Sequence, residues 1–194
     1  MLLDGSLLEV ACDNPCVVLY DDTRAITCAA SYWNVNASLA GAGEALFLLS
    51  NDSGHPKGQI FTDNLGLIDL LRSFNQHFAG FESTGWDVAA EPARFRMKRA
   101  NDCFSLECAS DVHVIDMEWR NLGSPYLLRS QVSDFGGEGG RSYEVSSVIV
   151  PASSGSIHLD GRSQPGTVIG PYGSLPKSAF LAFCETWSRL KEVP

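Results

Sequence analysis

His113, Asp116 and Glu118 are the side chains best placed for chemistry, because they lie together in one short segment. Imidazole and carboxylate groups act as general acids, general bases and metal ligands. On a regular strand, Asp116 and Glu118 point to one face and His113 points to the other. We take the three as candidate catalytic residues. The alternative interpretation is an exposed sheet face that carries ordinary solvated charges.

A second carboxylate pair, Asp134 and Glu138, lies in or beside the glycine-rich segment Gly136–Gly140. No Lys-Ser/Thr pair follows these glycines, and Gly41-Ala42-Gly43 lacks the third glycine of a dinucleotide-binding loop. We therefore expect no nucleotide cofactor. We expect Gly136–Gly140 to be a loop, and a lid over a binding site is one role for it.

The cysteines and histidines do not have metal-ligand spacing. The six cysteines form no repeated C-x2-C pair, and the four histidines lie far apart in the sequence. Structural zinc sites use such pairs. Each cysteine lies in an apolar stretch, which is typical of a buried free thiol. We expect neither a metal nor a cofactor.

Aromatic residues are the remaining candidates for ligand binding. Trp33, Phe95 and Trp119 all fall in segments with β-strand character. A curved sheet that packs on a helix often leaves an apolar cavity at its open end. We take these three aromatic residues as candidate ligand-binding residues. They could equally belong to a plain hydrophobic core.

A basic strand carries Arg94, Arg96 and Lys98 on alternate positions, with Arg99 beside them. One interpretation is a surface that binds an anionic ligand or an acidic partner. The other, which we favour, is cross-strand pairing with carboxylates such as Glu107.

The elements that must position these residues are mainly hairpins. Alternating apolar residues and turn formers predict strands within 16–33, 45–49, 59–61, 94–108, 112–119, 143–150 and 156–159. Asp160-Gly161 is typical of a type I′ hairpin turn. A change in apolar phase predicts a β-bulge near Val114-Ile115.

Helical spacing appears in two segments. In residues 64–80, leucines and phenylalanines share one face, with Thr62 or Asp63 as the N-cap and Gly80 as the stop. In residues 176–190, an apolar stripe runs from Phe180 to Leu190. The expected fold is therefore α+β: a mainly antiparallel sheet of hairpins with a central helix and a C-terminal helix packed on it.

Charge and composition narrow the functional classes. The chain has 194 residues and a net charge of -9, and 44% of its residues are hydrophobic. Residues 1–93 hold 12 acidic and three basic residues, so they carry the whole net charge. Such a chain is unsuited to nucleic acid, and it has no apolar run long enough for a membrane span. We expect one domain over residues 1–194 and, without a secretory signal in the sequence, a cytoplasmic location.

These observations lead to three functional expectations. The first is a binding domain with a sheet-and-helix cavity for a small apolar or amphipathic ligand. The second is a hydrolase that uses carboxylates and His113. The third is a protein-interaction module that forms a homodimer through an exposed sheet edge or its acidic half.

Overall fold

The computed structural model describes residues 7–52, 55–78, 80–81, 86–100, 102–135 and 141–190. The strands are β1 (Leu7–Asp13), β2 (Cys16–Tyr20), β3 (Ile26–Ser38), β4 (Gly43–Asp52), β5 (His55–Thr62), β6 (Ala90–Ala100), β7 (Cys103–Ser110), β8 (Val114–Leu122), β9 (Tyr126–Phe135), β10 (Arg141–Leu159), β11 (Arg162–Ser163) and β12 (Ala179–Arg189). A 3-10 turn, η1 (Leu65–Leu67), leads into the helix α1 (Ile68–Asn75). No helix in these ranges is long and apolar enough to cross a membrane.

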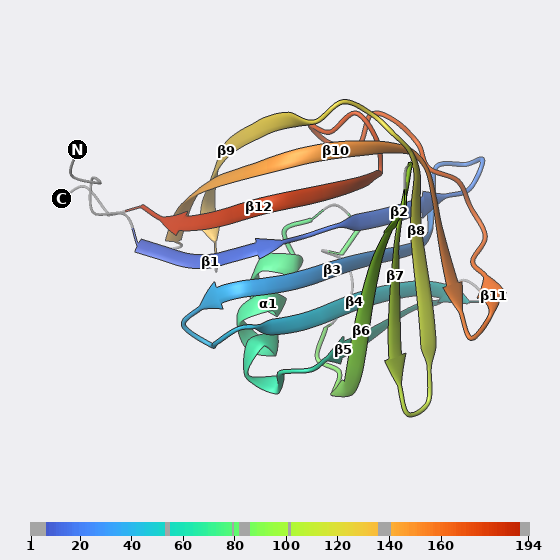
Figure 1. Cartoon of the computed structure of the whole chain (residues 1–194), viewed down its shortest axis with the longest axis horizontal. Helices are drawn as coiled ribbons and strands as arrows, with labels where there is room; N and C mark the ends of the chain where they lie inside the picture. Colours follow the sequence, from blue (N-terminus) through green and yellow to red (C-terminus); the bar gives the residue numbers. More distant parts are fainter. Residues whose placement is uncertain are drawn as a thin grey trace.

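The strands form one continuous, mostly antiparallel sheet that folds into two layers. We call the layer of β9, the first half of β10, β12, β1 with β2, β3, β4 and β5 the central sheet. We call the layer of β6, β7, β8, the second half of β10 and β11 the outer sheet. In Figure 1 the strands of the outer sheet cross those of the central sheet steeply, and β10 runs from one layer into the other.

In the middle of the central sheet both faces are buried. Alternate residues enter two hydrophobic clusters, as Val17 and Val18 on β2 illustrate. The first, which we call the helix-side cluster, includes Leu71 and Phe74 of α1. The second, the inter-sheet cluster, joins residues such as Leu48 of the central sheet to residues such as Leu106 of the outer sheet. The helix, the central sheet and the outer sheet thus make three layers.

The helix is shorter than predicted. The side chain of Asn64, rather than Thr62 or Asp63, accepts a hydrogen bond from the backbone N–H of Gly66, and α1 ends at Asn75. Polar residues follow Asn75, while Phe78 and Phe81 pack on the helix-side cluster from a turn. Gly80 has the expected positive φ, 91°, but it lies beyond the end of α1 and is not the stop of the helix.

The predicted C-terminal helix over 176–190 is wrong, because β12 occupies Ala179–Arg189. Phe180 and Ala182 belong to the helix-side cluster, whereas Ala179 and Leu181 belong to the inter-sheet cluster. A strand buried on both faces is apolar at successive positions and lacks the alternation that marks a half-buried strand. This is why the stripe in the sequence resembled a helix.

The predicted hairpin within 16–33 is confirmed by the pairing of β2 with β3. The strands predicted at 45–49 and 59–61 and within 94–108 are confirmed by the pairings of β4 with β5 and of β6 with β7. Asp160 and Gly161 both have positive φ, as a type I′ turn requires. The predicted bulge near Val114-Ile115 is absent, because β8 pairs with β7 and β10 in regular register. Val112 instead lies in the preceding turn, 73% exposed, and this explains the change of phase.

Candidate functional site

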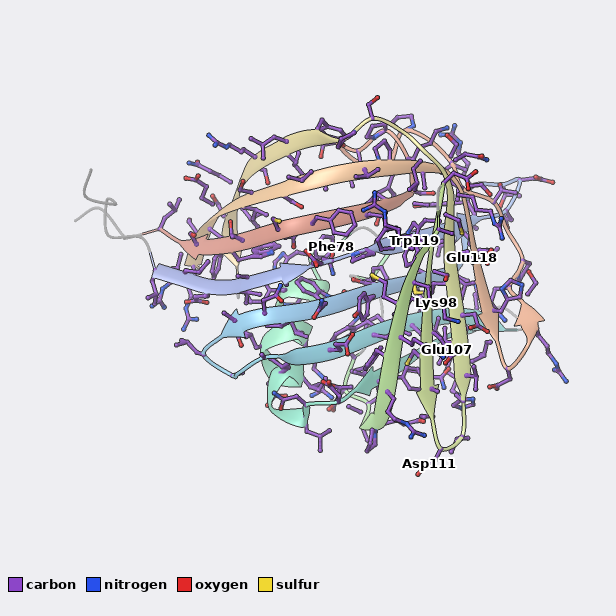
Figure 2. All side chains as sticks on the ribbon, viewed as in Figure 1. Phe78, Lys98, Glu107, Asp111, Glu118 and Trp119 are labelled. Atoms are coloured by element: carbon purple, nitrogen blue, oxygen red, sulfur yellow. The ribbon has the colours of Figure 1, made fainter. Side chains whose placement is uncertain are left out.

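A cavity of about 360 Å3 lies between the central sheet and the turn that follows α1. Its sheet wall comes from β9, β10 and β12, and its other walls come from residues 77–78 and the loop at 172–175. The apolar lining includes Phe78, labelled in Figure 2, with Val145, Ile149, Phe180 and Trp187. The polar lining consists of His77, Ser130, Ser174 and Glu185. The cavity is therefore mainly apolar, with a few polar groups in its wall.

Strand β9 builds one wall through its two-residue repeat. Leu128, Ser130 and Val132 face the cavity. Arg129 and Gln131, between them, are exposed and do not line it. Because side chains alternate along a strand, every second residue of this strand is available to shape the cavity.

A bulge in β12 directs Glu185 into the same space. Ser146 pairs with Thr186, but Val148 pairs with Phe183, so β12 has one residue more than β10 across this stretch. Cys184 has a φ of 52°, and its N–H donates to Asp13 Oδ1 at 2.8 Å. The extra residue shifts the side-chain alternation by one position, which leaves Cys184 exposed and places Glu185 and Trp187 on the helix side.

Glu185 is a buried carboxyl group, only 5% exposed. The indole Nε1–H of Trp187 donates to Glu185 Oε1 at 2.7 Å. Burial raises the pKa of Glu185 to about 7, against the opposing effects of Trp187 and the hydroxyl of Ser147. The Ser147 hydroxyl is 1% exposed, and although it favours the carboxylate, it makes no hydrogen bond of regular geometry to a described residue.

Glu9 is a second buried carboxylate, and its partners differ from those of Glu185. It is also 5% exposed, but Tyr143 Oη donates to its Oε2 at 2.7 Å. Arg189 Nε lies 3.1 Å from Glu9 Oε1, and Arg141 Nη1 lies 3.9 Å from the same oxygen. Glu185 has no ion pair with any residue that the structure describes. Two carboxyl groups with equal burial therefore differ in whether a cation accompanies them.

His113 is separated from the other two candidate catalytic residues. Its Nδ1 lies 2.9 Å from Asp160 Oδ2, while the N–H of Val114 donates to Asp160 Oδ1 at 2.9 Å. The backbone bond from Val114 and the contact with His113 lower the pKa of Asp160. This pair borders a polar cleft of about 600 Å3 that also includes Lys57 and Arg162.

Asp116 and Glu118 lie on the exposed face of the outer sheet. They border a shallow depression of about 320 Å3 with Arg96, Lys98 and Glu107. Arg96 pairs with Glu107 in register, so one pair of opposite charges faces across the strands, whereas the partner of Glu107 on its other side is Asp116, a like charge. Figure 2 labels Lys98, Glu107 and Glu118 on three neighbouring strands of this sheet, with Asp111 at a hairpin tip. Glu118 forms an ion pair with Arg120, whose Nη2 lies 2.9 Å from Glu118 Oε2.

The three aromatic candidates do not meet. Trp33 lies in the helix-side cluster, where its Nε1 donates to Asn75 Oδ1 at 3.4 Å. Trp119 lies in the inter-sheet cluster, where its Nε1 donates to the carbonyl of Cys16 at 2.9 Å. Phe95 packs at the margin of that second cluster against Tyr32. The central sheet therefore separates Trp33 from the other two residues.

Two further expectations concern a metal ion and the glycine-rich segment. Within the described ranges, no group of three or more histidine, cysteine or acidic side chains is placed to hold a metal ion. Gly136–Gly140 and the side chains of Asp134 and Glu138 lie outside the described residues.

Glu185 was not predicted as a site residue, because the sequence pattern around it favours a helix. In a helix, Glu185 would fall beside the apolar stripe and face solvent. The available signal was a lone acid next to the run Ala179-Phe180-Leu181-Ala182-Phe183, where charge is unusual in a buried strand.

Comparison with known proteins adds no family to this description. No model of a known protein family matches the chain, and no curated protein matches it significantly. The function must therefore be inferred from the site itself.

Proposed function

We propose that this protein binds a small, mainly apolar ligand in the cavity between the central sheet and the end of α1. The observation that carries the proposal is an apolar cavity of about 360 Å3 with one buried carboxyl group, Glu185, in its wall. Ligand sites in proteins are concave, mainly apolar and provided with a few convergent polar groups, and they range upward from about 300 Å3.

The position of this space supports the same proposal. It is open to solvent on one side, where Ser130 and Ser174 are exposed, and its wall includes the buried rings of Phe180 and Trp187. A small ligand can therefore enter from solvent and bury apolar surface against these rings.

The polar cleft beside His113 supports a second candidate, hydrolysis. An imidazole oriented by a carboxylate at 2.9 Å is the arrangement of a general base. No hydroxyl or thiol group in the described residues donates to the ring of His113, so water would be the nucleophile. In that case His113→Gln would abolish ester hydrolysis, while Glu185→Gln would leave it unchanged. We rank this candidate second because neither Asp116 nor Glu118 reaches the cleft.

Homodimerisation through the edge of β6 is disfavoured by charge. Beyond its short parallel pairing with β5 at residues 90–92, β6 pairs only with β7 among the described strands. Its basic residues, Arg94, Arg96 and Lys98, would face the same residues of a second copy. Positive charge on an edge strand is a common protection against such pairing.

A large side chain placed in the cavity from β9 should weaken ligand binding. Ser130 is exposed at the cavity wall, so a tryptophan there can enter the space with little effect on the core. We expect Ser130→Trp to weaken the binding of 1-aminoanthracene, an apolar fluorescent probe, by about tenfold or more, which corresponds to about 1.4 kcal/mol. The effect is measured by titrating the protein with 1-aminoanthracene and following the fluorescence of the probe, which is excited directly rather than through the tryptophans.

Gln131→Trp is the matched control, because Gln131 is the next residue on β9 and does not line the cavity. It should bind the probe as the unsubstituted protein does. Equal binding by both tryptophan variants, or no binding by the unsubstituted protein, would contradict the proposal.

A further inference from the structure

We infer that the ligand of this cavity is a small apolar amine whose ammonium group pairs with the carboxylate of Glu185. The inference rests on the proposed function and specifies the chemistry of the ligand. Three steps lead to it: the surroundings of Glu185, the comparison with Glu9, and the nature of the cavity wall.

The first step is the incomplete set of partners around Glu185. Trp187 donates the one regular hydrogen bond that the described side chains give this carboxyl group. An ionised carboxylate can accept several more hydrogen bonds. The Ser147 hydroxyl beside it is buried and has no hydrogen bond of regular geometry to a described residue, but it does not line the cavity. Glu185 thus keeps acceptor capacity at the cavity wall that a ligand donor can use.

The second step is the comparison with Glu9. The fold supplies Arg189 and Tyr143 to Glu9, although Glu9 is no more buried than Glu185. Removing a carboxylate from water is costly unless an opposite charge accompanies it. Glu185 has no such partner among the described residues, and it borders open space rather than packed protein. A bound ammonium group would supply the opposite charge.

The third step is the charge around the site. No lysine or arginine is in the described lining, and His77 is the one basic residue there. Asp13 on β1 adds negative potential at Glu185, and Cys12 and Cys16 lie close enough for Glu185 to raise the pKa of their thiols. The local field therefore favours a cation over an anion, while the apolar walls suit a hydrocarbon body.

The test compares two rigid probes of nearly equal shape, adamantan-1-amine and adamantan-1-ol, by calorimetry near pH 8. We expect the amine to bind at least about tenfold more tightly than the alcohol. Glu185→Gln should abolish this difference and keep the affinity for the alcohol. Glu144→Gln, an exposed acid on β10, is the control and should keep the difference.

The pH profile provides a second measurement. The carboxyl group has a pKa of about 7 and must lose its proton to pair with the amine, so amine affinity should rise about tenfold between pH 6 and pH 8. Protonation of His77 near pH 6 would also lower the affinity for the amine. The Glu185→Gln variant measures this contribution of His77 separately, because His77 is unchanged in it. A profile that is unchanged in Glu185→Gln would overturn the inference.

A third probe separates a free amine from a lysine side chain. Nα-acetyl-lysine N-methylamide carries the same ammonium group together with two amide groups that the apolar wall cannot satisfy. It should bind more weakly than adamantan-1-amine, and tighter binding would overturn the small-ligand form of the inference. Equal binding of adamantan-1-amine and adamantan-1-ol would contradict the pairing of an ammonium group with Glu185, but it would not contradict ligand binding in the cavity. Binding of no probe at all would reject the proposed function as well.

Discussion

The free energy of unfolding is expected to fall by about 2.5 kcal/mol between pH 5 and pH 8 because of Glu185, and Glu185→Gln should lack this decrease. The pKa of Glu185 is raised from 4.5 to about 7 by burial. The folded state therefore binds a proton more tightly than the unfolded state does. This contribution to stability is fully present below about pH 4.5 and is lost as the pH rises through 7.

Urea unfolding of both proteins across this pH range measures the effect. Other groups also titrate, including Glu44, whose pKa is raised by burial, but they are common to both proteins and cancel in the difference. Glu144→Gln should follow the unsubstituted protein. A parallel pH dependence of Glu185→Gln and the unsubstituted protein would show that the carboxyl group titrates normally.

Phe74→Ala is expected to lower the free energy of unfolding by about 4 kcal/mol. Phe74 is fully buried on α1, and its ring centroid lies 4.7 Å from Trp187, 5.5 Å from Tyr143 and 6.4 Å from Trp33. These three partners come from three different strands of the central sheet. The ring therefore joins the helix to three strands of the sheet, and its loss leaves a void that the rigid strands cannot close.

Leu70→Ala is the matched control, because Leu70 lies one turn earlier on the same helix and is only partly buried. We expect it to cost roughly 1 kcal/mol. Denaturant unfolding followed by near-ultraviolet circular dichroism compares the two variants. Equal losses would mean that Phe74 is not the principal contact. Because Trp187 also lines the cavity, Phe74→Ala should weaken binding of 1-aminoanthracene as well.

Local patterns in the sequence were sufficient for the hairpins. Asp160-Gly161 predicts a type I′ turn because few other residue pairs tolerate two positive φ angles. The alternation through Phe95 and Met97 likewise predicts a strand with one apolar face, as β6 is. In each case the decisive interaction lies within a few residues of the chain.

The sequence could not predict what depends on distant partners. Whether Ala179–Arg189 is a helix or a strand depends on β1, β2 and β10, which cover both of its edges. The bulge at Cys184 depends on Asp13, more than 160 residues earlier. Glu185 reaches the cavity only through that bulge, so the candidate site could not be found without the fold.

The place of β12 has a consequence for synthesis of the protein on the ribosome. This strand is the last one described, yet it lies inside the central sheet, between β10 and the pair β1 and β2. Until residues 179–189 leave the ribosome, the earlier strands present two unfilled edges with apolar faces. A partly folded chain that lacks β12 therefore exposes apolar surface and is prone to aggregation. The central sheet closes only when β12 inserts, which brings Leu7 and Arg189 into register.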